Sequence, residues 1–313
     1  MPHILCAVLP ILALVSVGLF APETDMRSAI KYLLNNKWVR ACLTLAVTAG
    51  LMLVAKAWHD TMRDPVVNRL TIESKHLPAG SESVTIALVA DIHMAGPEMT
   101  PERVERIVAQ TNALGADLIV IAGDLVSEKF FATKHYSAQE VVAPLAKLSA
   151  PLGVVFAPGN HDHWFGWEKL ERELGRQTNI TLLQNEAVQL GPIALAGLDD
   201  EHTKNHDIEA TRNAMLPLTG AQVWLSHTPD VFPSIPVSAD LALVGHTHCG
   251  QIGYPWGGSP VSMSKYGEKY MCGVVREDEK TMVVSAGLGN SVLPMRLFIQ
   301  PELWLVEVRS VRP

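Results

Sequence analysis

Short apolar runs alternate with amphipathic stretches through most of the chain. Residues 84–90, 117–122 and 153–157 are apolar runs of strand length. Between them, residues 101–114 and 137–148 place apolar side chains at helical spacing, with a proline inside the second stretch that bends or splits a helix. Buried strands alternating with helices predict an α/β sheet covered by helices. The second half is richer in predicted strands, at residues 193–198, 223–226, 241–244, 281–285 and 303–308.

Two longer uncharged stretches precede this pattern. Residues 4–21 hold no charged side chain, and residues 41–55 are uncharged with a tryptophan and a basic residue on either side. Because tryptophan and long basic side chains favour the membrane interface, a helix over residues 38–58 can cross a bilayer core of about 30 Å. We expect two transmembrane helices, at about 4–21 and 38–58. The alternatives are a cleaved signal peptide for the first stretch and a buried helix of a soluble domain for the second.

Charge is uneven along the chain. Residues 1–57 carry five basic and two acidic side chains, a net charge of +3, and the remainder carries 20 basic and 30 acidic side chains, a net charge of −10. The chain of 313 residues is 48% hydrophobic but only 6% aromatic, which indicates that part of it lies in lipid rather than in a large core. We therefore predict a membrane anchor over residues 1–57, a linker over 58–82 and an acidic domain over 83–313.

The same composition excludes several classes of protein. The high apolar content argues against an intrinsically disordered chain. Only four cysteines are present, which argues against a disulfide-stapled scaffold. The net charge of −7 argues against a nucleic-acid partner. The cysteines do not define a redox compartment, because Cys6 and Cys42 fall in the predicted membrane helices and Cys249 and Cys272 can pair only if the fold brings them together.

Polar side chains of metal-binding type stand where the predicted strands end. In open α/β sheets, ligands bind beyond the carboxyl ends of the strands. A single aspartate or histidine at such a place is usually a turn, a cap or a surface residue, but here five blocks occur in order after apolar runs. The residues concerned are Asp91, His93, Asp124, Asn160, His161, Asp162, His227, His246 and His248.

This mixture of donors indicates a transition-metal site. Carboxylate, imidazole and amide oxygen suit Mn, Fe or Zn without any thiolate. On an extended segment the side chains of Asp91 and His93 point to the same side, and the same holds for His246 and His248. Asp124 is placed to bridge two cations. Two metals about 3.5–4 Å apart can clamp an in-line displacement and lower the pKa of a water so that hydroxide forms near neutral pH.

In this order, Asp91-Ile-His93, Gly123-Asp124, Gly159-Asn160-His161-Asp162, His227 and Gly245-His246-Thr247-His248 resemble the calcineurin-like metallophosphoesterases. The resemblance extends from about residue 84 to 308 and implies a four-layer α/β/β/α sandwich with a dinuclear phosphoric ester or anhydride hydrolase site. It implies that one metal is held by Asp91, His93 and His248, that the other is held by Asn160, His227 and His246, and that Asp124 bridges them. Manganese is the favoured metal.

The resemblance also implies catalytic roles. A hydroxide bridging the metals attacks the phosphorus, and His161, which is not a ligand, protonates the oxygen of the leaving group. Asp162 orients His161. Cys249 departs from the family, in which glycine is common at this position. Its thiol is either an oxidation-sensitive group beside a metal ligand or a small buried side chain.

The flanking residues resemble a membrane-associated bacterial branch of the family, notably 248–251 and 285–289. This implies the inner membrane of a bacterium. Basic residues are nearly balanced on the two sides of the second predicted helix. The absence of Lys and Arg before the first predicted helix favours a cytoplasmic loop between the two helices, and with it a catalytic domain on the periplasmic face.

The substrate is less constrained by the sequence. The leading hypothesis is a phosphodiester or pyrophosphate bond in a membrane-associated, lipid-linked substrate such as UDP-2,3-diacylglucosamine or a phospholipid. The alternatives are a tethered phosphodiesterase for soluble nucleotides and a non-enzymatic metal-binding membrane scaffold. Aromatic residues at 163–167 and 254–256 form either an apolar rim at the pocket or ordinary packing. Arg296 is a candidate for binding a substrate phosphate or for a structural ion pair.

Overall fold

The structure is a computed structural model that describes residue 31 and residues 34–311. The chain divides into two units, Met1–Lys56 and Ala57–Pro313. The transmembrane helix expected at residues 4–21 lies outside the described residues. The second unit contains the sheets and the site, and the following description concerns that unit and helix α3, through which the two units are joined.

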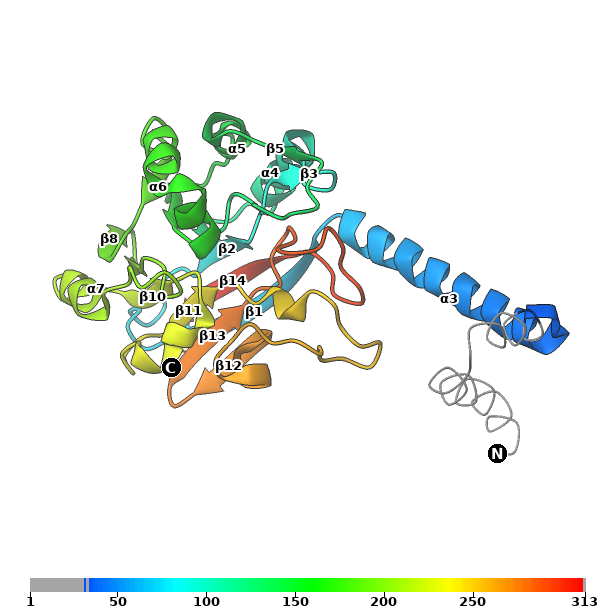
Figure 1. The fold of residues 1–313 in the computed structure, drawn as a ribbon. Helices are drawn as coiled ribbons and strands as arrows, with labels where there is room; N and C mark the ends of the chain where they lie inside the picture. Colours follow the sequence, from blue (N-terminus) through cyan, green and yellow to red (C-terminus); the bar gives the residue numbers. More distant parts are fainter. Residues whose placement is uncertain (1–30, 32–33, 312–313) are drawn as a thin grey trace. The chain divides into compact units, whose positions relative to one another are not determined.

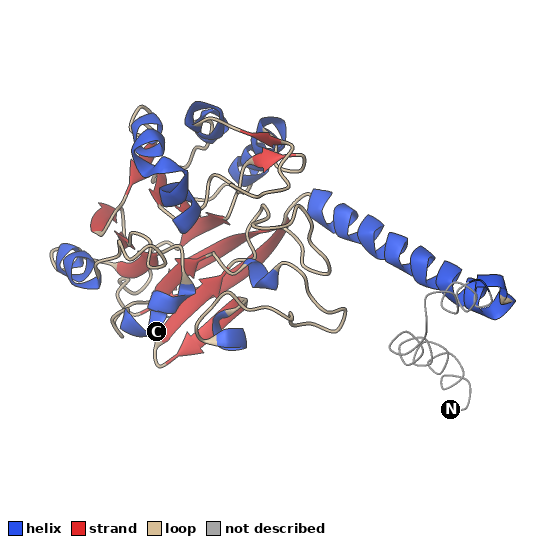
Figure 2. Ribbon diagram, in the orientation of Figure 1, coloured by secondary structure: helices blue, strands red, loops and turns tan. Residues whose placement is uncertain are grey.

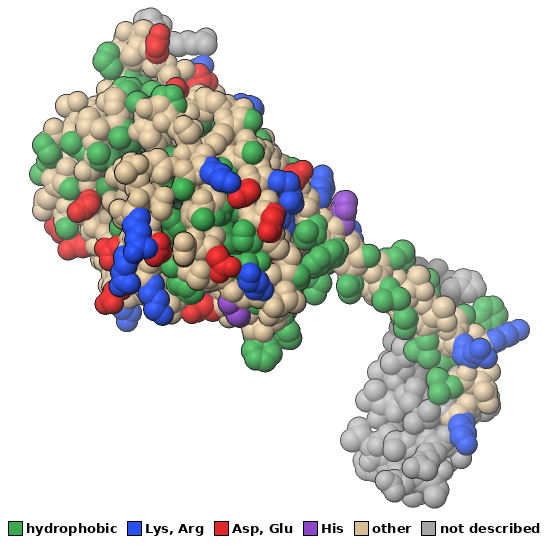
Figure 3. All heavy atoms as spheres, turned by 90° about the horizontal axis from the view of Figure 1, so that it is seen from above, with side chains coloured by type: hydrophobic (Ala, Val, Ile, Leu, Met, Phe, Trp, Pro, Cys, Tyr) green, Lys and Arg blue, Asp and Glu red, His purple; other side chains and the backbone are tan. Residues whose placement is uncertain are grey.

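Helix α3 (Lys37–Met62) is the single helix among the described residues that is long and apolar enough to cross a membrane. Its apolar window is exposed throughout, with apolar side chains along its length and basic side chains near its beginning (Figure 3). This agrees with the span expected at 38–58 by length and composition. The last turn differs, because Ala57, Asp60 and Thr61 are buried against the domain.

The first sheet has six strands in the order β1-β14-β2-β4-β6-β7. Strand β14 runs parallel to β1 and antiparallel to β2, and the strands from β2 to β7 are parallel. Their bounds are β1 Val66–Ser74, β14 Glu302–Ser310, β2 Val84–Ala90, β4 Leu118–Ala122, β6 Val154–Ala157 and β7 Ile180–Leu182. The apolar runs at 84–90, 117–122 and 153–157 therefore form the centre of this sheet, as predicted.

Strand β1 corrects the predicted linker over residues 58–82. It pairs with β14 from Val66–Glu302 to Ser74–Ser310, so this segment belongs to the domain. The strand escaped the sequence prediction because it lies at the edge of the sheet and is only partly buried, so its sequence VVNRLTIES is not a continuous apolar run. The compact unit accordingly begins at Ala57 rather than at residue 83.

The second sheet also has six strands, in the order β12-β13-β11-β10-β9-β8. The four central strands β13, β11, β10 and β9 are parallel to one another. The flanking strands β8 and β12 are antiparallel to their neighbours. Their bounds are β12 Gly273–Glu277, β13 Lys280–Val284, β11 Leu241–Val244, β10 Ala221–Leu225, β9 Ile193–Gly197 and β8 Glu186–Leu190. A two-stranded ribbon, β3 (Ala95–Gly96) with β5 (Lys134–His135), lies apart from both sheets.

Three apolar clusters define four layers (Figures 1 and 2). One cluster packs helices α4 (Pro101–Ala113), α5 (Ala138–Leu145) and α6 (Asn160–Leu174) on the first sheet. The second cluster fills the space between the sheets, where Val120 and Val223 are both fully buried. The third packs α7 (Ile208–Met215) and the 3₁₀ helix η1 (Pro229–Ser234) on the second sheet. The observed layers are those of the expected α/β/β/α sandwich.

Local sequence explains where the covering helices begin and end. Thr100 accepts a hydrogen bond from the Arg103 backbone N–H at the start of α4, and Pro101 occupies the first helical position. Ser137 and Glu140 form a reciprocal capping box at the start of α5. That helix ends at Leu145, one residue after Pro144, and is therefore shorter than the predicted stretch 137–148.

Candidate metal centre

Seven candidate ligands converge from the carboxyl ends of strands in both sheets. Asp91 follows β2, Asp124 follows β4 and Asn160 follows β6, while His227 follows β10. His246 and His248 follow β11 in the second sheet, and His93 lies two residues beyond Asp91. All seven positions were predicted from the sequence, and the packing of the two sheets brings their side chains to one place.

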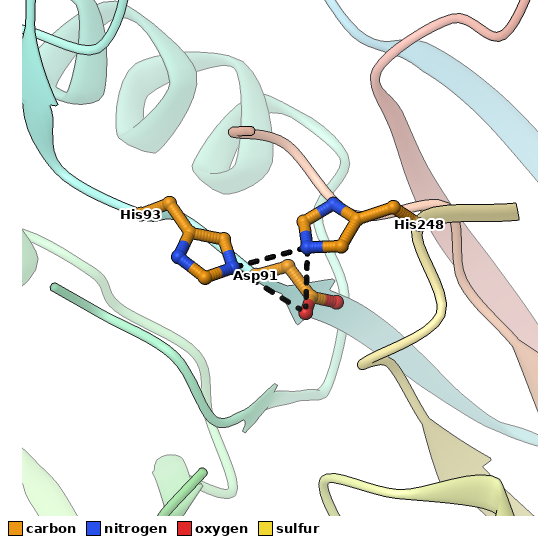
Figure 4. Close-up of side chains that lie close together, drawn as sticks. All are labelled: Asp91, His93 and His248. Atoms are coloured by element: carbon orange, nitrogen blue, oxygen red, sulfur yellow. Dashed lines mark hydrogen bonds and ion pairs between the residues drawn. The ribbon is translucent and has the colours of Figure 1, made fainter. Parts of the chain in front are cut away.

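One group of donors consists of Asp91, His93 and His248 (Figure 4). The Nε2 atoms of the two histidines are 3.0 Å apart. Asp91 Oδ1 lies 3.5 Å from His248 Nε2 and 3.9 Å from His93 Nε2. In Figure 4 the two imidazole rings and the carboxylate point toward a common centre. Asp91 and His93 are fully buried, so solvent does not compete for these donor atoms.

A second group of donors surrounds the Nε2 atom of His227. This atom lies 3.2 Å from Asn160 Oδ1 and 3.1 Å from His246 Nδ1. Asp124 Oδ2 lies 3.2 Å from the same His227 nitrogen and 3.3 Å from His93 Nε2 of the first group. The Asp124 carboxylate therefore stands between the two groups of donors.

The donor set fits divalent cations. Neighbouring ligands of a six-coordinate cation with bonds of about 2.1 Å are separated by about 3 Å, which is close to most of the distances above. Carboxylate, imidazole and amide oxygen are ligands that Mn, Fe and Zn accept. Two buried carboxylates, Asp91 and Asp124, lie among the donors, and the charge of bound cations would favour their ionised forms.

The backbone around the ligands differs from the expected extended segments. The φ angles of Asp91 and His93 are +50° and +47°, and those of His246 and His248 are +70° and +51°. Asp124 also lies in the left-handed region, at +55°. Non-glycine residues adopt this region rarely, and such strain is concentrated at functional sites. The side chains therefore converge through tight turns rather than through strand alternation.

Glycines beside the ligands leave room for this close packing. A Cβ atom on Gly245 would overlap the Asp91 carboxylate, and a Cβ atom on Gly159 would overlap Asp124 Oδ1. The backbone N–H of His246 donates to both oxygens of Asp91 at 3.0 Å. The glycines that begin the Gly-Asn-His-Asp and Gly-His-Thr-His blocks thus let these turns pack directly against the aspartates. Any residue with a Cβ atom at either position would prevent this contact.

Burial and neighbouring charge set the protonation of the ligands. Burial lowers the pKa of His93 and His248 well below its usual range, and it lowers the pKa of His246 to about 3. These imidazoles are therefore neutral and have a lone pair available for a metal. Burial raises the pKa of Asp91 to about 7. For Asp124, burial also opposes ionisation, but the surrounding histidines, His227 foremost, together outweigh it and lower the pKa of this carboxyl.

His161 lies at the site and lines the pocket, but its surroundings differ from the expectation. Its backbone N–H donates to Asp124 Oδ1 at 2.9 Å. Among the described residues, its buried Nδ1 atom has no hydrogen-bond partner. The Asp162 carboxylate instead accepts from the backbone N–H groups of Asp124 (2.8 Å), Leu125 (2.8 Å) and Gly159 (2.9 Å). Asp162 therefore fixes the loops that carry the ligands, and the expectation that it orients the His161 ring is wrong.

Arg296 is buried and contacts His248 and the loop after β13, so it is not placed to bind a substrate phosphate. Its Nη2 atom donates to the carbonyl oxygens of Ala286 (2.7 Å) and Gly289, and it lies 3.2 Å from His248 Nδ1. Its backbone N–H donates to the hydroxyl of Thr61, in the last turn of α3, at 2.7 Å. The sequence offered no signal for this link, because the residues are 235 positions apart.

Cys249 and Cys272 form a disulfide directly after the ligand His248. Their spacing in the sequence carried no disulfide signal, and the fold decides the pairing by placing the turn after β11 beside the residue that precedes β12. Cys249 is buried, as one of its two interpretations required, but as half of a disulfide rather than as a thiol. The Thr247 hydroxyl strengthens the same connection by donating to Met271 O at 2.6 Å.

The ligands open into a pocket with a volume of about 390 Å³. Asp124, Asn160, His161, His246 and His248 line one part of it. Trp164 and His202 also line the pocket, together with the apolar residues Ile252, Pro260, Val261, Met263, Val292 and Leu293.

The sequence left open whether the aromatic residues at 163–167 and 254–256 form a rim at the pocket or pack against the core, and both arrangements occur. Trp164 belongs to the pocket wall, whereas Phe165 and Trp167 pack on the apolar cluster beneath α6. Tyr254 and Trp256 stack on each other with ring centroids 5.3 Å apart and remain exposed.

Known proteins share this sequence pattern. The calcineurin-like phosphoesterase family matches residues 84–270. YkuE of Bacillus subtilis, named as an uncharacterised metallophosphoesterase, is 30% identical over 246 residues, which make up 77% of this chain and 84% of YkuE. An uncharacterised metallophosphoesterase of Helicobacter pylori is 31% identical over 79% of this chain and 65% of its own length. A Danio rerio protein named transmembrane protein with metallophosphoesterase domain is 29% identical over 88% of this chain and 64% of its own length.

The fold and the clustered carboxylate and imidazole groups define a metallophosphoesterase. The chain belongs to the calcineurin-like phosphoesterase family, as its motifs predicted. Membership implies hydrolysis of a phosphoester with the help of bound metal. The chain spans slightly less than two thirds of the length of the Helicobacter pylori and Danio rerio relatives.

Proposed function

We propose that the protein hydrolyses a phosphodiester or pyrophosphate bond in an amphiphilic, lipid-linked substrate at a membrane. Two divalent cations, with Mn favoured over Fe and Zn, are held at the site. Asp91, His93 and His248 hold one, Asn160, His227 and His246 hold the other, and Asp124 is shared.

One observation carries this proposal: the donor groups and an apolar wall face the same pocket. Phosphate binds at metal ions, whereas the apolar side chains Val261, Met263, Val292 and Leu293 offer nothing to the hydroxyls of a sugar or the polar edge of a base. A phosphoester that carries an acyl or isoprenyl chain matches both surfaces. A soluble nucleotide would leave the apolar wall in contact with water.

The chain's own residues divide the remaining work. Bound cations supply Lewis-acid activation of a water and neutralise the charge of the phosphate. His161 lines the pocket, and we propose that it donates a proton to the oxygen of the leaving group. Asp162 acts through the backbone, by holding the loops of Asp124 and Gly159 in place.

We further propose that α3 crosses the inner membrane of a bacterium and that the catalytic domain lies on the periplasmic face. The Cys249–Cys272 disulfide supports this side, because disulfides persist in oxidising compartments and are rare in the cytosol. A periplasmic site favours a phospholipid or an isoprenyl phosphate as the substrate. Hydrolysis of UDP-2,3-diacylglucosamine would require a site that faces the cytoplasm.

A substrate comparison with the purified, Mn-loaded full chain tests the proposal. The assay compares hydrolysis of phospholipid vesicles, an isoprenyl pyrophosphate, UDP-2,3-diacylglucosamine, a cyclic nucleotide and a soluble aryl phosphodiester. We expect kcat/KM to be higher for a lipid-linked substrate than for the nucleotide. Preferential hydrolysis of the nucleotide would overturn the lipid assignment and favour the tethered phosphodiesterase.

Two variants test the assigned residues in the same assay. Asp124→Ala removes the shared ligand and is expected to lose metal and most activity, so a normal content of two metals per chain would refute the bridge. His161→Ala is expected to retain metal while kcat falls by about 10²–10⁴-fold, the usual contribution of a general acid. An aryl oxide leaves readily without a proton, so full turnover of an aryl phosphodiester by His161→Ala would not test the role of His161 as an acid. An alkyl phosphodiester, whose leaving group needs the proton, is therefore the deciding substrate.

A further inference from the structure

Three loops expose large apolar side chains, and two of them line the pocket. We call them the rim loops and define them as residues 127–133, 251–263 and 291–298. Phe130 is 90% exposed, Trp256 is 80% exposed and Val292 is 68% exposed. Further exposed apolar side chains on the same loops are Phe131, Tyr254, Val261, Met263 and Leu293. A soluble protein rarely gathers so many large apolar side chains on its surface without a partner that covers them.

The rim loops are bonded to one another and form one surface. Gln251 Nε2 donates to the carbonyl oxygens of Leu293 (2.9 Å) and Met295 (3.0 Å), and the Ser291 N–H donates to Gln251 Oε1 at 3.0 Å. The first loop is joined to the residue that precedes the third, because Lys129 Nζ donates to Asn290 O at 3.4 Å. The three loops are therefore held to one another, and the second and third line the pocket.

The same surface is fastened to the last turn of α3. The Arg296 N–H donates to Thr61 Oγ1 at 2.7 Å, and the Phe298 N–H donates to Asp60 Oδ2 at 3.0 Å. Both acceptors belong to the compact unit that begins at Ala57. Figure 1 shows the gold loop after β11 and the orange loop before β14 on the edge of the domain where this last turn lies.

A buried ionic group strengthens the attachment. Glu98 and Lys129 form a fully buried ion pair, and Arg103 donates to Glu98 O at 2.9 Å and to Thr61 O at 2.6 Å. Removing one member of such a group leaves an uncompensated buried charge, so the group favours one arrangement of the segments that it joins. It links the loop of Phe130 to the end of α3.

We infer that the rim loops lie in the interfacial layer of the bilayer that α3 crosses, so that a lipid-linked phosphate reaches the metal centre from the membrane rather than from solution. Thr61 follows Trp58 by three residues, which is about 4.5 Å along a helix. A helix that crosses the bilayer up to Trp58 therefore holds the attached loops at the lipid surface. Tryptophan, tyrosine and phenylalanine are the side chains that favour this layer. The inference rests on the proposed membrane anchor and lipid-linked substrate, and it adds the surface that contacts the lipid.

Fluorescence quenching by brominated lipid tests the placement. The full chain, with Cys6 and Cys42 changed to serine, receives one cysteine at a time through W256C or F130C and is labelled with bimane. Matched controls are L216C and V237C, because Leu216 is 75% exposed and Val237 is 66% exposed and neither lies on a rim loop. Each labelled protein is placed in nanodiscs of phosphatidylcholine with or without bromine in the acyl chains.

We expect severalfold quenching by brominated lipid at positions 256 and 130 and none at positions 216 and 237. Equal emission with both lipids at 256 and 130 would overturn the inference, as would equal quenching at all four positions. A rim covered by a second copy of the chain would also give no quenching and would overturn it. Mn-dependent hydrolysis of a soluble aryl phosphodiester by the same samples tests the proposed function separately. Absence of this activity in the unlabelled parent would reject the proposed function and would leave the quenching result unaffected.

Discussion

Arg296 Nη2 lies 3.2 Å from Nδ1 of His248, although the two residues are 48 positions apart. Arg296 is fully buried and also binds the hydroxyl of Thr61 through its backbone. A candidate metal ligand is therefore held by the same residue that contacts the end of the apolar helix. The orientation of the His248 ring is coupled to packing that lies outside the ligand set.

This coupling predicts that Arg296→Lys weakens metal binding. Lysine retains a positive charge but lacks the planar fork that reaches Ala286 O, Gly289 O and His248 together. Residues that orient metal ligands typically change metal affinity by about 10–100-fold. Titration of the metal-free, detergent-solubilised chain with Mn²⁺ measures the change. Arg309→Lys is the matched control, because Arg309 makes a partly exposed ion pair with Glu73. Equal affinities of the two variants would show that Arg296 does not position the site.

Gly245→Ala should disrupt the metal centre without removing any ligand. The added methyl group would overlap the Asp91 carboxylate and displace either Asp91 or the turn that carries His246. We expect loss of bound Mn and loss of phosphoesterase activity, as measured by metal analysis and turnover of an aryl phosphodiester. Gly50→Ala serves as the control because a Cβ atom at this helical glycine meets nothing within 4 Å. A Gly245→Ala protein with full metal content would contradict the close packing described for this turn.

Reduction of the Cys249–Cys272 disulfide should destabilise the domain. The bond closes a loop with a sequence separation of 23, for which the chain-entropy relation gives a stabilisation of about 3 kcal/mol. Cys249→Ser with Cys272→Ser should lower the thermal unfolding midpoint, and a phosphine reductant should do the same to the parent protein. Cys42→Ser is the control, since Cys42 is a free, exposed cysteine. An unchanged midpoint in the double variant would show that the turn after His248 is held by other contacts.

The His163–Asp199 pair predicts a pH dependence of stability. His163 Nε2 lies 2.7 Å from Asp199 Oδ1. Burial opposes the charged form of His163, but the bond to Asp199 outweighs it and raises the pKa of the histidine, while His163 and other donors outweigh burial and lower the pKa of Asp199. The histidine contribution is complete below the unfolded pKa of 6.5 and is lost as pH rises through the raised folded value. The aspartate contribution is present above 3.8 and is lost as pH falls through the lowered folded value.

Asp199→Asn should therefore destabilise the protein more at about pH 5.5 than at about pH 8.5. The difference should be about 1 kcal/mol or less, because His163 is only partly buried and solvent screens the pair. Thermal unfolding of the parent and the variant at both pH values measures it. Glu173→Gln, which breaks a surface pair with Arg176, should show a smaller change. A pH-independent effect of Asp199→Asn would mean that the hydrogen bonds that Asp199 accepts from the uncharged donors Gln184 and the Asp200 backbone dominate.

The sequence by itself determined the family, the layered α/β organisation and the positions of all seven candidate ligands. This was possible because the central strands are buried on both faces and read as continuous apolar runs, and because each ligand follows such a run within a short distance. Asp91, Asp124 and Asn160 could thus be assigned to strand ends in the first sheet, and His227 and His246 to strand ends in the second. The apolar span that became α3 was visible for the same reason, since a bilayer requires an uninterrupted length of apolar sequence.

The tertiary structure alone decided contacts between segments that are far apart in the sequence. Strand β1 reads as a polar segment because it is an edge strand, and only its pairing with β14 shows that it belongs to the sheet. The disulfide and the Arg296–His248 contact depend on how separate turns pack, which no local pattern encodes. Asp162 was expected to bind the His161 ring beside it, but backbone N–H groups of the β4 loop reach its carboxylate instead. Local patterns encode burial and chain reversal, whereas the partner of a buried polar group is settled only when the layers come together.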